Sequence, residues 1–169
     1  EGFNQYMNIL SAADVAKAVP NLDERGSSYG STSGNEGEPP MMWNANYAGP
    51  AFYGFETYQK TPLMLSMLGG IVGDTAVQRA QSEWGKAWMF KHPSPWDYAF
   101  FMSNALKQDL GWFWNYWLFT TETVNGSIQD VTTAGARTIV TVRTDGQMPH
   151  PVGLKVEFAR GGAAANAQP

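Results

Sequence analysis

The chain contains no cysteine among its 169 residues, which excludes disulfide bonds and thiolate metal sites. Charged residues make up only 15% and the net charge is −4, so no basic stripe is present and a nucleic-acid partner is not expected. No apolar run approaches the roughly 20 residues that span a bilayer. No signal peptide is visible. Because the sequence begins at Glu1 and not at Met, we expect it to begin inside a larger product or after processing.

Aromatic residues are abundant, with seven Trp, seven Tyr and nine Phe. This content predicts a large aromatic core or a broad surface that another chain or domain covers. The length fits one domain, or one domain with a small appendage.

Apolar residues spaced three and four apart predict helices over residues 3–19, 58–72, 75–90, 95–107 and 110–119. Ser94, Pro95 and Asp97 form a pattern typical of a capping box with proline in the first turn. Asp74 and Asp109 are expected to cap the helices that follow them. On the helix 75–90, the predicted inner face consists of Val77, Ala80, Trp84, Ala87 and Trp88.

The remaining segments lack helical periodicity. Residues 23–40 are rich in Gly, Ser and Asn and are expected to form a linker, and residues 41–53 an irregular but ordered segment. After Thr121 the period becomes two, which predicts strands over 127–133, 138–142 and 152–158. The expected fold class is therefore α+β, with helical residues 1–121, an antiparallel β extension over 122–160, and a disordered small-residue tail over 161–169.

Two residues stand out as candidates for chemistry. Glu1 precedes a predicted helix, where the helix dipole alone would favour a carboxylate. Tyr58 begins a predicted apolar helix, where packing alone would explain an aromatic ring. His92 and His150 each lie beside proline and lack the i, i+4 spacing of a zinc site, so we expect them to be structural or solvent-facing.

Glu1-Gly2-Phe3 leading into a helix, and Tyr58-Gln59-Lys60 at the start of an apolar helix, together resemble the aminopeptidase N-like (gluzincin) family of zinc metallopeptidases. The resemblance extends over roughly residues 1–121. It includes Gly73-Asp74, the break Lys91-His92-Pro93-Ser94-Pro95 with Asp97, and the helix that begins Asp109-Leu110-Gly111-Trp112-Phe113-Trp114. Gln59 and Thr61 depart from the commonest form of the family's tyrosine motif.

The resemblance implies the C-terminal part of a thermolysin-like catalytic domain. It implies that Glu1 is a third zinc ligand and that the Tyr58 hydroxyl binds the oxyanion of a tetrahedral intermediate. It also implies zinc as cofactor, a peptide as substrate, and a bacterial, periplasmic or extracellular location. The family's H-E-x-x-H is missing from this chain. Glu1 would therefore bind zinc only if a missing N-terminal catalytic half supplies that segment.

Three hypotheses follow for the chain. It is a peptidase fragment that is inactive in isolation, a non-catalytic structural or binding subunit of a larger assembly built on a peptidase-derived fold, or one part of a split enzyme. The aromatic content motivates the second hypothesis, and the expected partner is the missing N-terminal catalytic half or another protein subunit.

Overall fold

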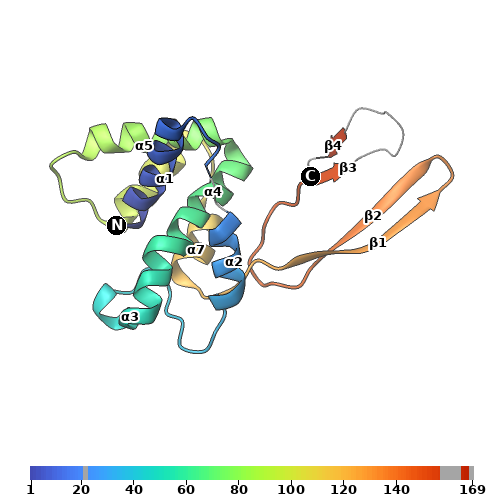
Figure 1. Ribbon diagram of the computed structural model, residues 1–169, viewed down its shortest axis with the longest axis horizontal. Coiled ribbons are helices and arrows are strands. Elements are labelled where there is room, and N and C mark those ends of the chain that lie inside the picture. Colours follow the sequence, from blue (N-terminus) through green and yellow to red (C-terminus); the bar gives the residue numbers. More distant parts are fainter. Residues whose placement is uncertain (21–22, 157–164, 168–169) are drawn as a thin grey trace. The chain divides into compact units, whose positions relative to one another are not determined.

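The computed structural model describes residues 1–20, 23–156 and 165–167. It shows a mainly helical α+β chain that divides into two compact units, residues 1–122 and 123–169 (Figure 1). The sequence analysis placed this division one residue earlier, after residue 121. No helix in the described part of the chain is long and apolar enough to cross a membrane.

The first unit consists of helices and one π-helical turn. In chain order they are α1 (Gly2–Ala16), α2 (Asp23–Thr32), α3 (Ala45–Phe55), the π-helix η1 (Glu56–Lys60), α4 (Thr61–Val72), α5 (Asp74–Trp88), α6 (Pro95–Leu106) and α7 (Gly111–Phe119).

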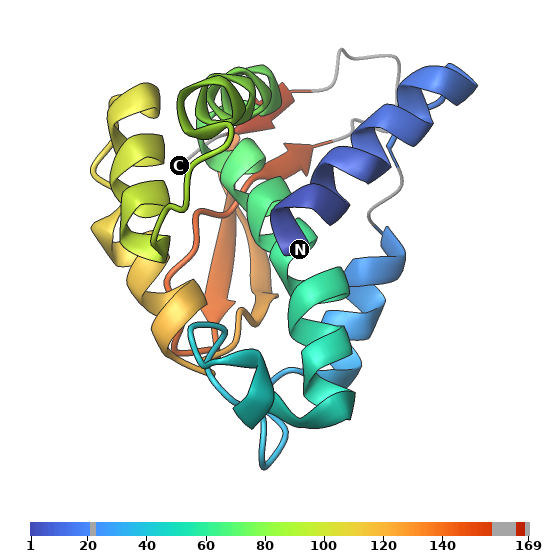
Figure 2. The same cartoon turned by 90° about the vertical axis from the view of Figure 1, so that its left-hand side faces the viewer.

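The core of this unit lies around α4. Met64, Leu65 and Leu68 on α4 are fully buried, because this helix is apolar on nearly every face, as the sequence predicts. Helices α1 and α5 pack directly against α4, and α6 packs against α5. Figure 2 shows the start of α1, marked N, beside the helix formed by η1 and α4. This packing brings the first residue of the chain next to residues almost 60 positions away.

The segments expected to be linker and irregular structure are largely helical. Residues 23–32 form α2 although they favour a loop, because buried Tyr29 packs on Trp117 of α7 with ring centroids 5.8 Å apart. Residues 45–55 form α3, whose N-cap Asn44 accepts a hydrogen bond from Asn46 N at 3.0 Å. The helix is kinked at Gly49, where φ is 70°. Tertiary packing and capping therefore override the local composition.

The helix predicted over residues 58–72 begins before residue 58, and its first part is a π-helical turn. The chain runs from α3 into η1 without leaving helical geometry, and the π-helical turn ends at Lys60. Pro62 lies in the first turn of α4, as the sequence predicts. A single π turn inside a longer helix is a feature that often accompanies functional residues.

Helix α5 corrects two sequence expectations. Gly73 is its N-cap and Asp74 its first residue, so Asp74 does not cap it. Ala87 is exposed, while Gln81 is buried because its Nε2 donates to the Tyr98 hydroxyl at 2.7 Å. A polar residue thus replaces a predicted apolar one on the inner face.

Helix α7 carries three of the seven tryptophans. Phe113, Trp114 and Trp117 are buried, so the aromatic helix is mainly core. Its N-cap is Leu110, and Asp109 instead accepts a hydrogen bond from Gly111 N at 3.1 Å. The expected Asp109 cap is therefore displaced by one residue.

The capping box at α6 is confirmed. Ser94 Oγ accepts from Asp97 N at 3.3 Å, and the Asp97 carboxylate accepts from Ser94 N at 2.7 Å. The hydrogen bonds from Ser94 lower the pKa of Asp97.

Replacing Ser94 with Ala is expected to reduce the free energy of unfolding by about 1 kcal/mol, the usual effect of losing an N-cap. Folding lowers the pKa of Asp97, so the Asp97 carboxylate contributes to the free energy of unfolding above its unfolded pKa. This contribution is lost as pH falls through the folded pKa. Urea denaturation of Ser94→Ala and wild type at neutral and acidic pH measures both effects. Equal stabilities at neutral pH would show that the cap contributes nothing.

The described residues of the second unit form two separate antiparallel strand pairs. Strand β1 (Gly126–Ala134) pairs with β2 (Arg137–Thr144), with Gly135 at φ 65° in the turn between them. Strand β3 (Leu154–Val156) pairs with β4 (Ala165–Ala167). β4 lies in the segment expected to be disordered, so that expectation is wrong for these three residues. The rest of the tail, and residues 157 and 158 of the third predicted strand, lie outside the described residues.

Candidate functional site

Glu1 and Tyr58, the two residues singled out from the sequence, are in contact. The Tyr58 hydroxyl donates a hydrogen bond of 2.7 Å to Glu1 Oε2, across 57 positions of sequence. The Tyr53 hydroxyl donates to the same oxygen. Glu1 is exposed and Tyr58 is 39% exposed, so the cluster opens to solvent. Sequence reasoning missed Tyr53, because its segment was expected to be irregular.

Gly2 allows Glu1 to come this close to η1. A Cβ atom at position 2 would lie 2.5 Å from both Cβ and Cγ2 of Thr61 and 2.7 Å from its Oγ1. Thr61 is buried and is held in place because its Oγ1 donates to the Glu56 carbonyl oxygen at 2.7 Å. Glycine is therefore required where the first turn of α1 meets the first turn of α4.

The hydrogen bonds set the charge state of the site. Those from Tyr53 and Tyr58 lower the pKa of Glu1, so the carboxylate is ionised at neutral pH. The same bond to Glu1 raises the pKa of Tyr53 to about 12 and raises the pKa of Tyr58. Both phenols keep their protons at neutral pH. The site therefore presents a carboxylate and two hydroxyl donors.

Replacing either tyrosine with Phe is expected to raise the pKa of Glu1 towards its ordinary value, and Tyr53→Phe is expected to have the larger effect. Each hydroxyl stabilises the charged carboxylate, so its loss favours the protonated form. An NMR titration of the Glu1 carboxyl carbon measures the shift. Tyr47→Phe, at a 78% exposed ring, is the matched control. A Glu1 pKa unchanged by both replacements would contradict the hydrogen-bonded geometry.

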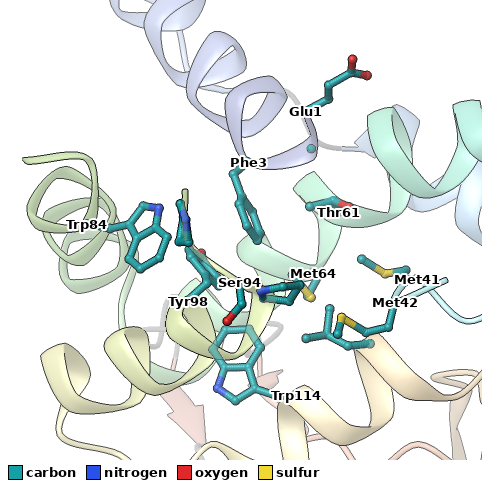
Figure 3. A pocket seen from close by; sticks show the side chains of 14 residues that line it. Glu1, Phe3, Met41, Met42, Thr61, Met64, Trp84, Ser94, Tyr98 and Trp114 are labelled. Carbon is teal, nitrogen blue, oxygen red and sulfur yellow. The ribbon is translucent and has the colours of Figure 1, made fainter. Parts of the chain in front are cut away.

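Glu1 lines a cavity on each of two sides in the described part of the chain. The first, about 320 Å³, is mainly apolar, and its lining includes Phe3, Met42, Met64, Trp84, Tyr98 and Trp114. Phe3 stacks on Tyr98 within it, with ring centroids 3.9 Å apart. Figure 3 shows Phe3 pointing into this cavity and the Glu1 carboxylate pointing away from it. The second cavity, about 300 Å³, is lined by Glu1, Tyr53, Glu56, Thr57 and Thr61 among others. The polar chemistry therefore lies on the side of η1.

A buried ionic cluster lies on η1 and was not predicted. Lys60 Nζ, with no exposed side-chain surface, lies 2.5 Å from Glu38 Oε1 and 3.4 Å from Glu56 Oε1. Glu38 Oε2 accepts from Gly34 N at 2.5 Å. The i, i+4 spacing of Glu56 and Lys60 was the available sequence signal. Glu38 carried no signal, since it lies in the segment expected to be a linker.

The histidines take no part in the site. His92 is exposed, and the ring of His150 forms a hydrogen bond with the Met148 carbonyl oxygen at 3.2 Å in the second unit. Within residues 1–20, 23–156 and 165–167, no three His, Asp or Glu side chains come together to hold a metal ion.

A catalytic zinc ion typically has three protein ligands, and the cluster at Glu1 offers one carboxylate. The residues that the structure describes therefore do not complete a zinc site by themselves. In the comparisons with known proteins, the chain matches no protein-family model, no curated protein and no solved structure.

Proposed function

We propose that residues 1–122 form the C-terminal part of the catalytic domain of a zinc aminopeptidase-like protein. One observation carries the proposal. Glu1 and Tyr58, chosen from separate sequence motifs, share a hydrogen bond of 2.7 Å at a solvent-facing site. A carboxylate buried in an ion pair far from Tyr58 would have been the contrary finding. The peptide substrate, and a periplasmic or extracellular location, belong to the same proposal.

In this proposal Glu1 supplies a charged oxygen ligand and Tyr58 supplies a hydrogen-bond donor. The ionised carboxylate and the protonated phenol have the charge states that these roles need. Tyr58 would donate to the oxygen that gains negative charge during peptide hydrolysis. Tyr53 would keep the Glu1 carboxylate in place when Tyr58 turns to the substrate. The two histidine ligands of the H-E-x-x-H motif would come from a segment outside this chain. The isolated chain is therefore expected to be inactive.

The reading frame upstream of the Glu1 codon provides the first test, because the proposal requires an H-E-x-x-H about 20 residues before Glu1. The chain extended by this segment is expected to bind zinc and to release N-terminal residues from chromogenic peptides. Glu1→Ala is expected to lose the zinc. Tyr58→Phe is expected to keep the zinc and to lower kcat by about 10²–10³-fold, as loss of an oxyanion donor does.

Two outcomes would overturn this function. One is an upstream reading frame that lacks the H-E-x-x-H motif, together with the finding that this chain binds no zinc when it is mixed with a separate chain that carries the motif. The other is an extended chain whose zinc content and activity are unaffected by Glu1→Ala and Tyr58→Phe.

A second candidate function, a structural or binding subunit, is favoured by exposed aromatic residues on α6 and just before it. Phe90 is 98% exposed and Phe100 is 67% exposed, while Trp96 stacks on Phe119 and remains 52% exposed. Such surfaces commonly meet another protein. Light scattering after size exclusion tests this reading. A folded, monomeric chain with no tendency to associate would remove its main support.

A further inference from the structure

We propose that the buried cluster of Glu38, Glu56 and Lys60 positions the Tyr58 hydroxyl against Glu1, and that one proton held by this cluster controls the position. The inference deepens the proposed function, on which its catalytic meaning rests. Its structural content concerns residues of this chain alone and is measurable without zinc or substrate.

The connection is the π-helix itself. Within the five residues of η1, Glu56 and Lys60 are buried while Tyr58 between them is exposed and reaches Glu1. Lys60 joins this turn to Glu38 in the loop before α3, at 2.5 Å. Any shift of the ionic cluster therefore moves the turn that carries Tyr58. The cluster acts through Tyr58 and is not itself in contact with the proposed substrate.

Charge balance makes the cluster sensitive to a proton. Two carboxylates share one ammonium group in a buried site, so with both ionised the cluster would carry a net negative charge. Among the described residues, Glu56 Oε2 is buried without a hydrogen-bond partner. An unpartnered buried carboxylate oxygen favours the protonated acid. The geometry thus identifies Glu56 as the group that holds the proton.

The electrostatics agree. Burial raises the pKa of Glu56 to about 8; Lys60 acts in the opposite direction and the Glu38 carboxylate adds to the rise. Glu1 and Tyr53 line the same 300 Å³ cavity as Glu56. Helix α2 also packs against η1, and Tyr29 is the titratable residue among its residues 26–32. Helix α4 has no titratable residue. Among the described side chains, Lys60 is the cation that forms an ion pair with Glu56.

Two pH-dependent effects follow. The folded pKa of Glu56, about 8, lies above its ordinary value of 4.5. The folded state therefore holds a proton that the unfolded state has released between these values. The contribution of Glu56 to the free energy of unfolding is fully present below pH 4.5. It declines as pH rises towards about 8 and does not change further above that value. Above about pH 8, ionised Glu56 places a second negative charge beside Glu38, and η1 shifts away from Glu1.

The test is an NMR titration of the chain labelled with ¹³Cζ-tyrosine, in which Tyr58→Phe assigns the Tyr58 signal. In wild type this signal is expected to shift with a midpoint near pH 8, before Tyr58 itself ionises. Glu56→Gln mimics the protonated acid, so its Tyr58 signal is expected to stay at the low-pH position. Its melting temperature is also expected to lose the decline that wild type shows between pH 5 and 8. Glu36→Gln, at an exposed glutamate in the same loop as Glu38, is the matched control and should titrate as wild type does.

A second variant keeps the proposal falsifiable if Glu56→Gln does not fold. Glu38→Gln removes the charge that opposes ionisation of Glu56, so the Tyr58 midpoint is expected to move to lower pH. The proposal is overturned if the folded wild-type Tyr58 signal does not change near pH 8, or if the transition survives unchanged in either variant. Absence of zinc binding in the extended chain would overturn the proposed peptidase function and leave this result standing.

Discussion

Replacing Lys60 with Met is expected to reduce the free energy of unfolding by about 3–5 kcal/mol, since removing one partner of a buried ion pair leaves an uncompensated charge. Lys60 has no exposed side-chain surface and lies between Glu38 and Glu56. Met fills a similar volume, so the effect reports charge more than packing. In urea denaturation at neutral pH, the midpoint is expected to fall by about 2 M.

Lys17→Met is the matched control. Lys17 also forms an ion pair, with Asp14 at 3.1 Å, but both side chains are at least 80% exposed. Its loss is expected to change stability by less than about 1 kcal/mol. The double variant Lys60→Met with Glu38→Gln should recover part of the lost stability, because Glu56 can then remain protonated. A double variant no more stable than Lys60→Met would show that the loss has another origin.

Replacing Gly2 with Ala is expected to separate Glu1 from Tyr53 and Tyr58 and to destabilise the unit by about 1–3 kcal/mol, the usual range for overpacking. The added Cβ would lie 2.5 Å from Thr61, whose hydroxyl is held by the Glu56 carbonyl. The first turn of α1 must therefore move. Thermal unfolding measures the loss, and the pKa of Glu1 should rise as its hydrogen bonds break.

Gly85→Ala controls for the change of residue type. Gly85 lies exposed within α5, and a Cβ added there meets nothing within 4 Å. Alanine is the better helix former, so this variant is expected to gain about 0.5–1 kcal/mol. If Gly2→Ala also gained stability and left the Glu1 pKa unchanged, the close approach to Thr61 would be disproved.

The sequence predicted those elements whose signals are local. The capping box at Ser94 and the strands β1 and β2 follow from turn chemistry and alternation over short stretches. Helix α2 could not be predicted from local sequence signals. Its Gly- and Ser-rich residues have weak helix propensity, and its packing rests on the distant contact between Tyr29 and Trp117.

The residues of the candidate site likewise fall into those predicted from local motifs and those found only in the structure. Glu1 and Tyr58 were chosen from their motifs, and the structure places them in contact. Tyr53 on α3 also contacts Glu1, and Glu38 in the loop before α3 pairs with Lys60; neither segment shows a periodic pattern. The partnership of Lys60 with Glu38 spans 22 positions and depends on how that loop folds back, which a single sequence does not encode locally.

The π turn at η1 makes the site sensitive to chain length more than to residue identity. In an α-helix each residue advances by about 100°, so deleting a single residue between Phe55 and Thr61 would turn Tyr58 to another face while leaving α4 intact. The half-buried residues Thr57 and Gln59, on either side of Tyr58, could change in type without causing this rotation. Insertions and deletions are therefore excluded from these five residues by geometry, even where substitutions are tolerated.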